Sequence, residues 1–445
     1  PDERVWDFKT YSEPGIISWG MLIQLSTRSV KRFEKLISPL VRKIALRKAK
    51  DWILSHQDDS GDWGGIYPPV MYNIIALELL GLDPEDERLK RAWQALDRFS
   101  IYHKEEDGLH MQACVSPVWD TAWSVFALAE AGVDIGSKEM QAHVDWLYSQ
   151  QIFRDGDWSV KNPKAVPGAW CFQFHNDFYP DIDDTAIVLM ALLWGGGFSN
   201  VKCMRSEQVR LGFEWLMAMQ NNDGGWSAFE NGVNKDIVNH IPFNDIDNML
   251  DPSTADLTGH VLEMLGNFGY DKSFPPAASG IEFCKQTQEP TGAWWGRWGV
   301  NYIYGTHGVL CGLAAVGVDM SQPWIRKAVD WLYSVQKEDG SWGEDCESYN
   351  DDKYYGKGES TPSQTAWALL ALMAAGEVKD TRVAMGIEWF ISTENDGGGW
   401  DEVKFTGTGF PNAFYLNYHY YREYFPLMCL ARYRNLRSGA GDSPA

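Results

Sequence analysis

An all-α fold built from α/α barrels, also called an α/α toroid, is the fold class that this sequence predicts. Three features predict it. A Gln-x-x-x-Gly-x-Trp turn recurs along the 445 residues, a helix with an aromatic residue precedes each turn, and an apolar helix rich in Ala, Leu and Gly follows it. Repeats spaced by some tens of residues indicate stacked pairs of helices. The amphipathic helices would then form an outer ring around a tightly packed inner ring of small-residue helices.

The recurring turns connect each outer helix to the next inner one. Four segments fit the Gln-x-x-x-Gly-x-Trp pattern: residues 57–63, 220–226, 288–294 and 336–342. Two copies depart from it, because one extra residue lies between Gln151 and Trp158, and Glu394 replaces Gln before Trp400. A Gln side chain can bond backbone groups at the end of one helix and the start of the next, and the Trp can stack on it. We therefore expect these turns to stabilise the barrel and to take no part in chemistry.

The helices alternate in character along the chain. The aromatic residues that precede the turns are Trp52, Trp146, Trp215, Phe283, Trp331 and Trp389. The expected inner helices span residues 73–82, 121–132, 185–195, 257–266, 307–317 and 365–376. Most of the inner helices begin with acidic or hydroxyl caps, and we expect their N-termini to converge on one end of the barrel.

The composition excludes several classes of protein. A formal net charge of −22 argues against a general nucleic-acid binder. The seven cysteines form no Cys-x-x-Cys pair, which suits a reducing compartment and gives no zinc-site spacing. No apolar run reaches the roughly 18 residues needed to span a bilayer. Aromatic residues make up 14% of the chain, and this excess predicts surfaces built from ring faces. Because the chain begins at Pro1, we expect a fragment or a processed product.

The first fifty residues combine an apolar run, 16–23, with a basic stretch, 28–50, in which Glu34 is the single acidic residue. An apolar patch beside cations is typical of a monotopic membrane contact, since the cations meet anionic headgroups. A loop packed on the next domain, followed by a solvated basic helix, fits the same pattern equally well.

Three carboxyl groups lie within four residues, at Asp181, Asp183 and Asp184, where an inner helix is expected to begin. Neighbouring carboxylates disfavour each other's ionisation, so one of them tends to keep its proton. A plain helix cap with two solvated acids is the alternative. Since a helix N-terminus stabilises negative charge, including that of a carboxylate that has given up a proton, the cluster is a candidate acid catalyst.

The repeated turns together with Asp-Ile-Asp-Asp-Thr at 181–185 resemble the bacterial squalene–hopene cyclases, a family of class II triterpene cyclases. Further matching segments are residues 116–121, 172–174, 239–243, 258–263, 296–302 and 407–416. The resemblance covers nearly the whole chain, although family members are longer at the N-terminus. It implies the two-barrel class II terpene cyclase architecture. Residues 1–119 would be part of the second α/α barrel, with a candidate membrane-contact segment at 14–50, and residues 120–445 would be the catalytic-side barrel.

The resemblance implies an enzyme that protonates squalene and cyclises it through carbocations to the pentacyclic hopanoids hopene or hopanol, without a metal or a cofactor. The D-x-D-D pattern resembles the form that acts on plain alkenes rather than epoxides. A cyclase of another linear polyprene or squalene derivative and a non-catalytic α/α-barrel scaffold remain as alternatives. Protein prenyltransferase β-subunits share similar turns but need a zinc site that these spacings do not provide.

The family's proton donor matches Asp183, and its hydrogen-bonded partner matches His260. A protonated imidazole at His260 would stabilise the carboxylate that proton loss leaves behind. By the same resemblance, Asp181 and Asp184 would orient and polarise the donor, and Asp256 would assist His260.

The resemblance also assigns aromatic residues that would hold cations without capturing them. They are Trp119, Phe172, Trp298, Tyr304, Phe410, Phe414, Tyr418 and Tyr421. Two departures put the product in doubt: Phe229 stands where the family commonly has Tyr, and Tyr67 replaces a usual Gln. Ile66, Tyr67 and Pro68 would lie near the water that quenches the final cation. The implied partners are a squalene-like substrate, the cytoplasmic face of the cell membrane in monotopic contact, and a second copy in a homodimer, with no nucleic acid.

Overall fold

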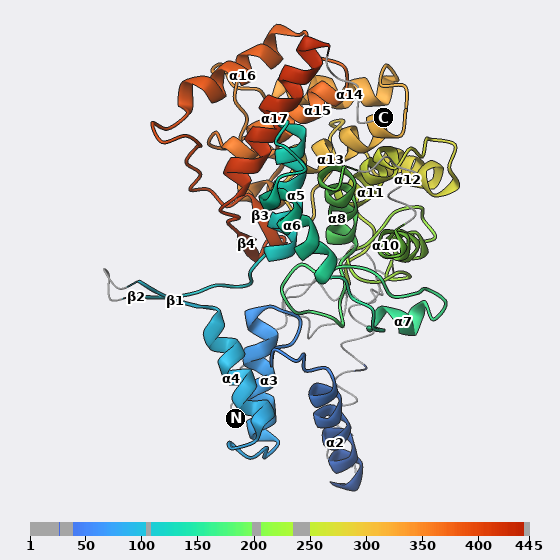
Figure 1. The fold of residues 1–445 in the computed structure, drawn as a ribbon, viewed down its shortest axis with the longest axis vertical. Helices are drawn as coiled ribbons and strands as arrows, with labels where there is room; N and C mark the ends of the chain where they lie inside the picture. Colours follow the sequence, from blue (N-terminus) through green and yellow to red (C-terminus); the bar gives the residue numbers. More distant parts are fainter. Residues whose placement is uncertain (1–25, 27–38, 104–107, 198–205, 235–249, 440–445) are drawn as a thin grey trace. The chain divides into compact units, whose positions relative to one another are not determined.

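The structure is a computed structural model that describes residues 26, 39–103, 108–197, 206–234 and 250–439. It is mainly helical, and the only strands of the described residues form two small hairpins (Figure 1). The chain divides into two compact units: the described residues of 1–111 and 233–252 form one, and those of 112–232 and 253–445 form the other. The apolar run 16–23 and the matched segment 239–243 lie outside the described residues.

The first unit is a small helical unit with one hairpin. It contains α2 (Pro39–Ser55), α3 (Tyr67–Leu79), α4 (Glu87–Arg98), β1 (Ser100–His103) and β2 (Gly108–Met111). Helices α3 and α4 pack together around buried Val70, Leu77 and Leu89, and β1 pairs with β2 in antiparallel register. This unit therefore has a core of its own.

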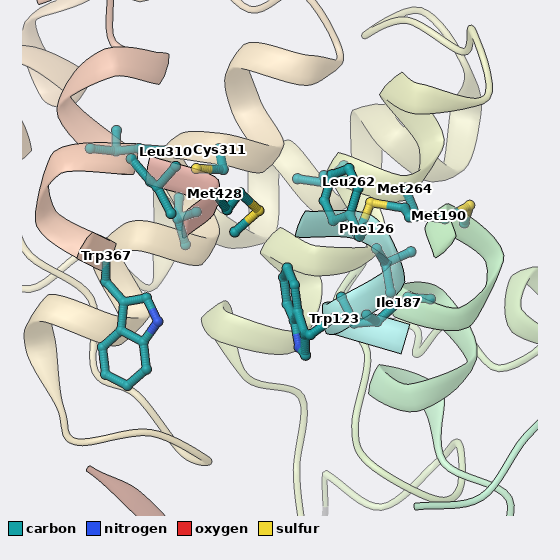
Figure 2. Packing of buried hydrophobic residues seen from close by; sticks show 14 of the residues in the cluster. Trp123, Phe126, Ile187, Met190, Leu262, Met264, Leu310, Cys311, Trp367 and Met428 are labelled. Atoms are coloured by element: carbon teal, nitrogen blue, oxygen red, sulfur yellow. The ribbon is translucent and has the colours of Figure 1, made fainter. Parts of the chain in front are cut away.

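The second unit contains a closed inner ring of helices. The ring consists of α5 (Pro117–Glu130), α8 (Ile182–Gly195), α11 (Ala255–Asn267), α13 (Tyr302–Ala315), α15 (Pro362–Ala374) and α17 (Tyr421–Ser438). Each of these helices packs against the next, and α17 packs against α5. Side chains from several of them meet in one hydrophobic core that includes Trp123, Ile187 and Trp367 (Figure 2). The predicted α/α-barrel class is confirmed.

An outer layer of amphipathic helices covers the inner ring. It consists of α6 (Lys138–Ser149), α10 (Glu207–Ala218), α12 (Pro275–Gln286), α14 (Pro323–Ser334) and α16 (Thr381–Thr393). The connections carry short elements: α7 (Trp158–Lys161), the 3₁₀ turns η2 (Cys346–Tyr349) and η3 (Asp352–Tyr354), and the antiparallel strands β3 (Gly407–Phe410) and β4 (Phe414–Leu416).

The sequence placed the N-terminal ends of the inner helices several residues too late. Proline is part of the reason, since Pro117 and Pro362 each occupy the first turn of an inner helix. Proline is accepted there because the N–H that it lacks has no partner within the helix. Helix α17, which contains Pro426 and closes the ring, had no sequence prediction at all.

The recurring turns link neighbouring helices through hydrogen bonds of the Gln amide. The Nε2 of Gln288 donates to the carbonyl oxygens of Gly292 (2.7 Å) and Trp324 (2.8 Å), which lie in its own turn and in the next outer helix. The indole of Trp294 donates to the carbonyl of Cys284, at the end of the preceding helix. The turns at Gln57, Gln220 and Gln336 repeat this geometry. The turns are therefore structural.

Glycine lets two inner helices approach each other very closely. A Cβ atom placed on Gly259 of α11 would lie 2.3 Å from the carbonyl carbon of Gly308 of α13, and one on Gly312 would lie 2.3 Å from the oxygen of Gly259. Real Cβ atoms do not come so near to backbone, so only glycine permits this contact. The contact fixes the spacing of the two helices.

Replacing Gly259 by Ala should therefore destabilise the second unit. We expect a loss of about 1–3 kcal/mol or more in the free energy of unfolding, because the extra methyl group would push α11 and α13 apart. Gly397→Ala is the matched control, since its Cβ would meet nothing within 4 Å and should change stability by less than about 0.5 kcal/mol. Urea unfolding of both variants measures the difference, and equal midpoints would contradict the close packing.

Candidate active site

The acidic cluster lies at the N-terminus of α8, and Asp181 caps that helix. The Oδ1 atom of Asp181 accepts hydrogen bonds from the backbone N–H groups of Asp183 (2.7 Å) and Asp184 (3.2 Å). Its own N–H donates to the carbonyl of Trp170 at 2.8 Å, and its carbonyl accepts from the Thr185 hydroxyl. Asp181 is thus a helix cap, which was the alternative interpretation of the acidic cluster. The carboxyl groups of Asp183 and Asp184 are not used in this cap.

Asp183 forms a buried pair with His260 of the neighbouring inner helix α11. The Oδ1 of Asp183 lies 2.6 Å from the Nδ1 of His260, and the two residues are only 6% and 1% exposed. Burial works against a charged imidazole, but the charge of Asp183 and its hydrogen bond, followed by the charges of Glu263 and Asp256, raise the pKa of His260 overall. The pair therefore favours a protonated His260 against the Asp183 carboxyl.

Asp184 is a carboxyl group that keeps its proton. It is 2% exposed, and the pKa of its carboxyl is raised well above the usual range, by burial first and then by the charges of Asp181, Asp183 and Asp120. A neutral Asp184 adds no negative charge to the cluster.

Asp256 holds the turn before α13. Its Oδ2 accepts from the backbone N–H groups of Arg297 (2.7 Å) and Trp298 (3.0 Å), and its Oδ1 accepts from the N–H of Leu257. Burial raises the pKa of this carboxyl. Asp256 therefore acts on His260 through its charge while it positions the backbone of Trp298.

Several of the expected aromatic residues gather around His260. The ring centroids of Tyr304 and Trp119 lie 5.8 Å and 6.4 Å from that of His260. The Trp119 indole donates to the Tyr421 hydroxyl at 3.0 Å, and Tyr421 stacks on Tyr418 with a centroid distance of 4.3 Å. These rings come from three inner helices and from the segment before α17, and two of them, Tyr304 and Trp119, lie beside His260.

In the described part of the chain, the other expected aromatic residues make no ring contact with His260. The Phe172 ring packs edge-on against Tyr418, with centroids 6.0 Å apart. The Trp298 ring packs edge-on against Phe229, whereas Phe414 on β4 is exposed. Ile66, Tyr67 and Pro68 belong to the first unit. Ile66 directly precedes α3, and Tyr67 and Pro68 are the first two residues of that helix.

The sequence analysis assigned no role to two residues of the site, Arg297 and Asp120. The Arg297 guanidinium lies 4.1 Å from the centroid of the Trp298 ring and 5.7 Å from the centroid of the Phe410 ring. The Asp120 carboxylate accepts from the hydroxyls of Ser116 (2.6 Å) and Tyr424 (3.1 Å), and burial raises its pKa. Arg297 lies in the matched segment 296–302, but only its aromatic neighbour had been singled out. Asp120 lies in the matched segment 116–121, where only Trp119 was singled out.

The described residues contain no group of three or more His, Cys, Asp or Glu side chains arranged to hold a metal ion. None of their helices is both long and apolar enough to span a bilayer.

The fold and the site together define an α/α-barrel protein with a buried carboxyl–imidazole pair among aromatic rings. Its residues 115–435 match the profile described as squalene-hopene cyclase C-terminal domain, and residues 2–107 match that of the N-terminal domain. The chain therefore belongs to the squalene–hopene cyclase family, as the sequence motifs indicated.

Two curated relatives are named squalene–hopene cyclase. The protein of Bradyrhizobium diazoefficiens is 42% identical over 437 residues, which cover 95% of this chain and 64% of the relative. That of Alicyclobacillus acidocaldarius is 43% identical over 420 residues, 93% of this chain and 65% of the relative. The chain thus spans just under two thirds of their length. A solved structure of a protein from Actinoplanes is similar in fold alone, with a TM-score of 0.51, 16% identity, and coverage of 89% of this chain and 99% of that one.

The protonated state of Asp184 predicts a pH-dependent effect of Asp184→Asn on stability. Because the folded pKa is raised, folding favours the protonated acid, and the wild type loses stability as pH rises above the unfolded value of about 4. The uncharged Asn avoids this loss, so the variant should gain stability over the wild type between about pH 4 and pH 8, as measured by thermal unfolding.

Asp380→Asn is a control of opposite sign. The side chain of Asp380 caps α16 and binds Arg382, and that side-chain hydrogen bond lowers the Asp380 pKa. Its contribution to stability is present above about pH 4 and is lost as pH falls through the lowered pKa. The variant should therefore be less stable than the wild type at neutral pH and similar to it in acid. The same pH trend in both variants would contradict a neutral Asp184.

Proposed function

We propose that this protein cyclises squalene to pentacyclic hopanoids, with Asp183 as the acid that protonates the terminal alkene. The observation that carries the proposal is the 2.6 Å pair of Asp183 and His260, buried among aromatic rings. The names of the two relatives give the substrate and product class of those proteins, and we extend it to this chain.

An alkene is a very weak base, so its protonation needs an acid much stronger than a solvated carboxyl group. In the proposed step the proton leaves the Asp183 carboxyl for an alkene carbon, and the carboxylate left behind stays paired with the His260 cation. That pairing stabilises the product of proton transfer and so strengthens the acid. Asp184 stays neutral and adds no repulsion, while Asp181 fixes the backbone of the donor.

Cyclisation then passes through carbocations that the protein has to stabilise without trapping. Ring faces do this through quadrupole attraction worth roughly 0.5–2 kcal/mol each. Burial raises the pKa values of Tyr304, Tyr418 and Tyr421 well above the usual range, so these residues remain neutral phenols. A phenolate would attack the cation, whereas a neutral ring does not. Loss of a proton from the last cation gives hopene, and capture of water gives hopanol.

Another linear polyprene, or a squalene derivative, is the second candidate substrate. Phe229 packs against Trp298 where the family commonly has Tyr, and it has no hydroxyl to offer. Tyr67 replaces a usual Gln in the segment proposed to lie near the quenching water. These departures concern the product rather than the acid step. A non-catalytic α/α-barrel scaffold is the third hypothesis for the function of this protein.

We keep the two-barrel division as a proposal, with residues 1–119 as part of one barrel and 120–445 as the catalytic-side barrel. The boundary between the two compact units, after residue 111, supports a division in this region. Monotopic contact with the cytoplasmic face of the membrane and a homodimer are likewise proposals. The membrane contact is proposed because the segment 14–50 combines an apolar run with a basic stretch. The homodimer is proposed from the family resemblance alone.

The acid assignment is tested with squalene and mass spectrometry of the products. Wild-type protein should form pentacyclic products, and Asp183→Asn should reduce turnover by at least about 10²–10⁴-fold, because the amide cannot supply the proton. Asp380→Asn, on the surface, should retain wild-type turnover. Undiminished activity of the Asp183 variant would mean that the donor lies elsewhere, and a wild type inactive on every linear polyprene would remove the enzyme proposal.

Membrane contact is tested by liposome flotation. Replacing the apolar residues of 16–23 by Ser, with the basic stretch kept, should release the protein from anionic liposomes, because the cations alone do not enter the acyl boundary. The control replaces six exposed apolar residues of the second unit by Ser, and this variant should still float: Phe153, Val160, Val166, Met385, Ile391 and Val403. Equal binding of wild type and variant would contradict the proposed contact.

A further inference from the structure

The far side of the catalytic imidazole has an unexplained pair of buried nitrogens. His260 uses its Nδ1 for Asp183, and its Nε2 is buried with no hydrogen-bond partner among the described residues. The Nδ1 of His307, on the neighbouring helix α13, is also buried, and it too finds no partner in the described part of the chain. His307 is 2% exposed. Buried polar groups without partners are rare, and each costs free energy unless something satisfies it.

The two imidazoles face each other across the close contact of α11 and α13. Their ring centroids are 6.4 Å apart with an interplanar angle of 70°. A Cβ placed on Gly308, next to His307, would lie 3.6 Å from the Cδ2 of His260. Because Cδ2 is bonded to Nε2, the edge of His260 that carries the unpartnered nitrogen is turned toward α13.

The separation of the rings fits one bridging molecule better than direct contact. A direct N–H···N bond would bring imidazole centroids to roughly 5 Å, whereas one intervening water places them roughly 6–7 Å apart. Buried waters typically satisfy polar groups of this kind, and they need at least two polar partners. The two nitrogens are such partners.

The protonation states of the two imidazoles decide which one donates and which one accepts a hydrogen bond. Burial, together with the charges of His260 and Arg432, lowers the pKa of His307 well below its usual range, so His307 is neutral and can accept a hydrogen bond at Nδ1. His260 has a raised pKa, and as a cation it carries a proton on Nε2 and can only donate there. One ring therefore offers a donor and the other an acceptor.

We propose that His307 is a positioning residue for the acid: through one buried water molecule, its Nδ1 accepts the hydrogen bond that the Nε2–H of the His260 cation offers. The water accepts from His260 and donates to His307. A hydrogen bond to the charged form of a group favours that form. His307 thereby keeps His260 protonated and fixes its orientation toward Asp183. This proposal deepens the proposed function and rests on it for the role of Asp183.

Several other ionisable groups lie on the helices around His260, and Asp183, Glu263 and Asp256 raise its pKa. These ionisable groups are Asp183 on α8, Asp256 and Glu263 on α11, Tyr304 and His307 on α13, and Arg432 on α17, which lies 3.9 Å from Glu263 and is held by Glu130 of α5. Exchanging the side chain at 307 leaves all the other groups in place. The variants below therefore isolate the contribution of one nitrogen.

The test compares His307→Asn with His307→Leu. Asn and Leu have nearly the same shape, and the Asn amide can replace Nδ1 as an acceptor whereas Leu cannot. Both proteins are labelled with ¹⁵N-histidine, His260 is assigned from the His260→Gln spectrum, and its pKa is followed by NMR. We expect the His260 pKa to fall by about one unit in the Leu variant and to stay near the wild-type value in the Asn variant.

The pH profile of squalene turnover is the second readout. In the Leu variant the loss of activity with rising pH should begin about one pH unit lower, and the Asn variant should restore the wild-type profile. Equal His260 pKa values in the Leu variant and the wild type would overturn the proposal. The NMR titration needs no substrate, so an inactive wild type with the expected shift would contradict the proposed function alone.

A crystal structure of the wild type keeps the proposal testable if the Leu variant does not fold. A water within about 3.2 Å of both nitrogens is expected. Direct contact of these nitrogens with carbon atoms, or a direct bond between the two rings, would overturn the water bridge.

Discussion

The close approach of α11 and α13 is the constraint on which the site depends. Gly259 and Gly308 bring the two backbones together, and this sets where His260 lies relative to the residues of α13. On its other side, His260 meets Asp183 of α8 at 2.6 Å. A buried carboxyl and imidazole are costly unless each finds its partner, so the spacing of three inner helices decides whether the pair exists at all.

Carboxylates from connecting loops cap the inner helices, and this pattern explains how the barrel tolerates so many buried acids. Glu344 accepts from the N–H groups of Asn301 and Ile303 at the start of α13, and Glu402 accepts from the N–H of Ser363 at the start of α15. Asp181 does the same for its own helix. Helix N-termini stabilise negative charge, and backbone N–H groups occupy these oxygens. Asp183 differs, because its partner is an imidazole.

The repeat, the fold class and the family can all be predicted from the amino-acid sequence. Spacing along the chain is enough for these, because the Gln–Trp turns and the small-residue helices are local patterns that alternate in a fixed order. It also located the three carboxyls at a helix start, since capping residues and the apolar run that follows them are read directly from the chain. The residues matched by resemblance included Asp183 and His260 before any geometry was known.

The contacts of each of these residues could not be predicted from the sequence and are seen only in the folded protein. Asp181 and Asp183 look alike in the sequence. In the structure, Asp181 accepts hydrogen bonds from backbone N–H groups, whereas Asp183 contacts His260 of α11. Arg297 was overlooked because its contact with Phe410 joins segments more than a hundred residues apart, and His307 because nothing in α13 reveals that His260 lies opposite. Burial, pKa and hydrogen bonding of a side chain depend on its neighbours from other helices. The spacing of residues along the chain does not specify these neighbours.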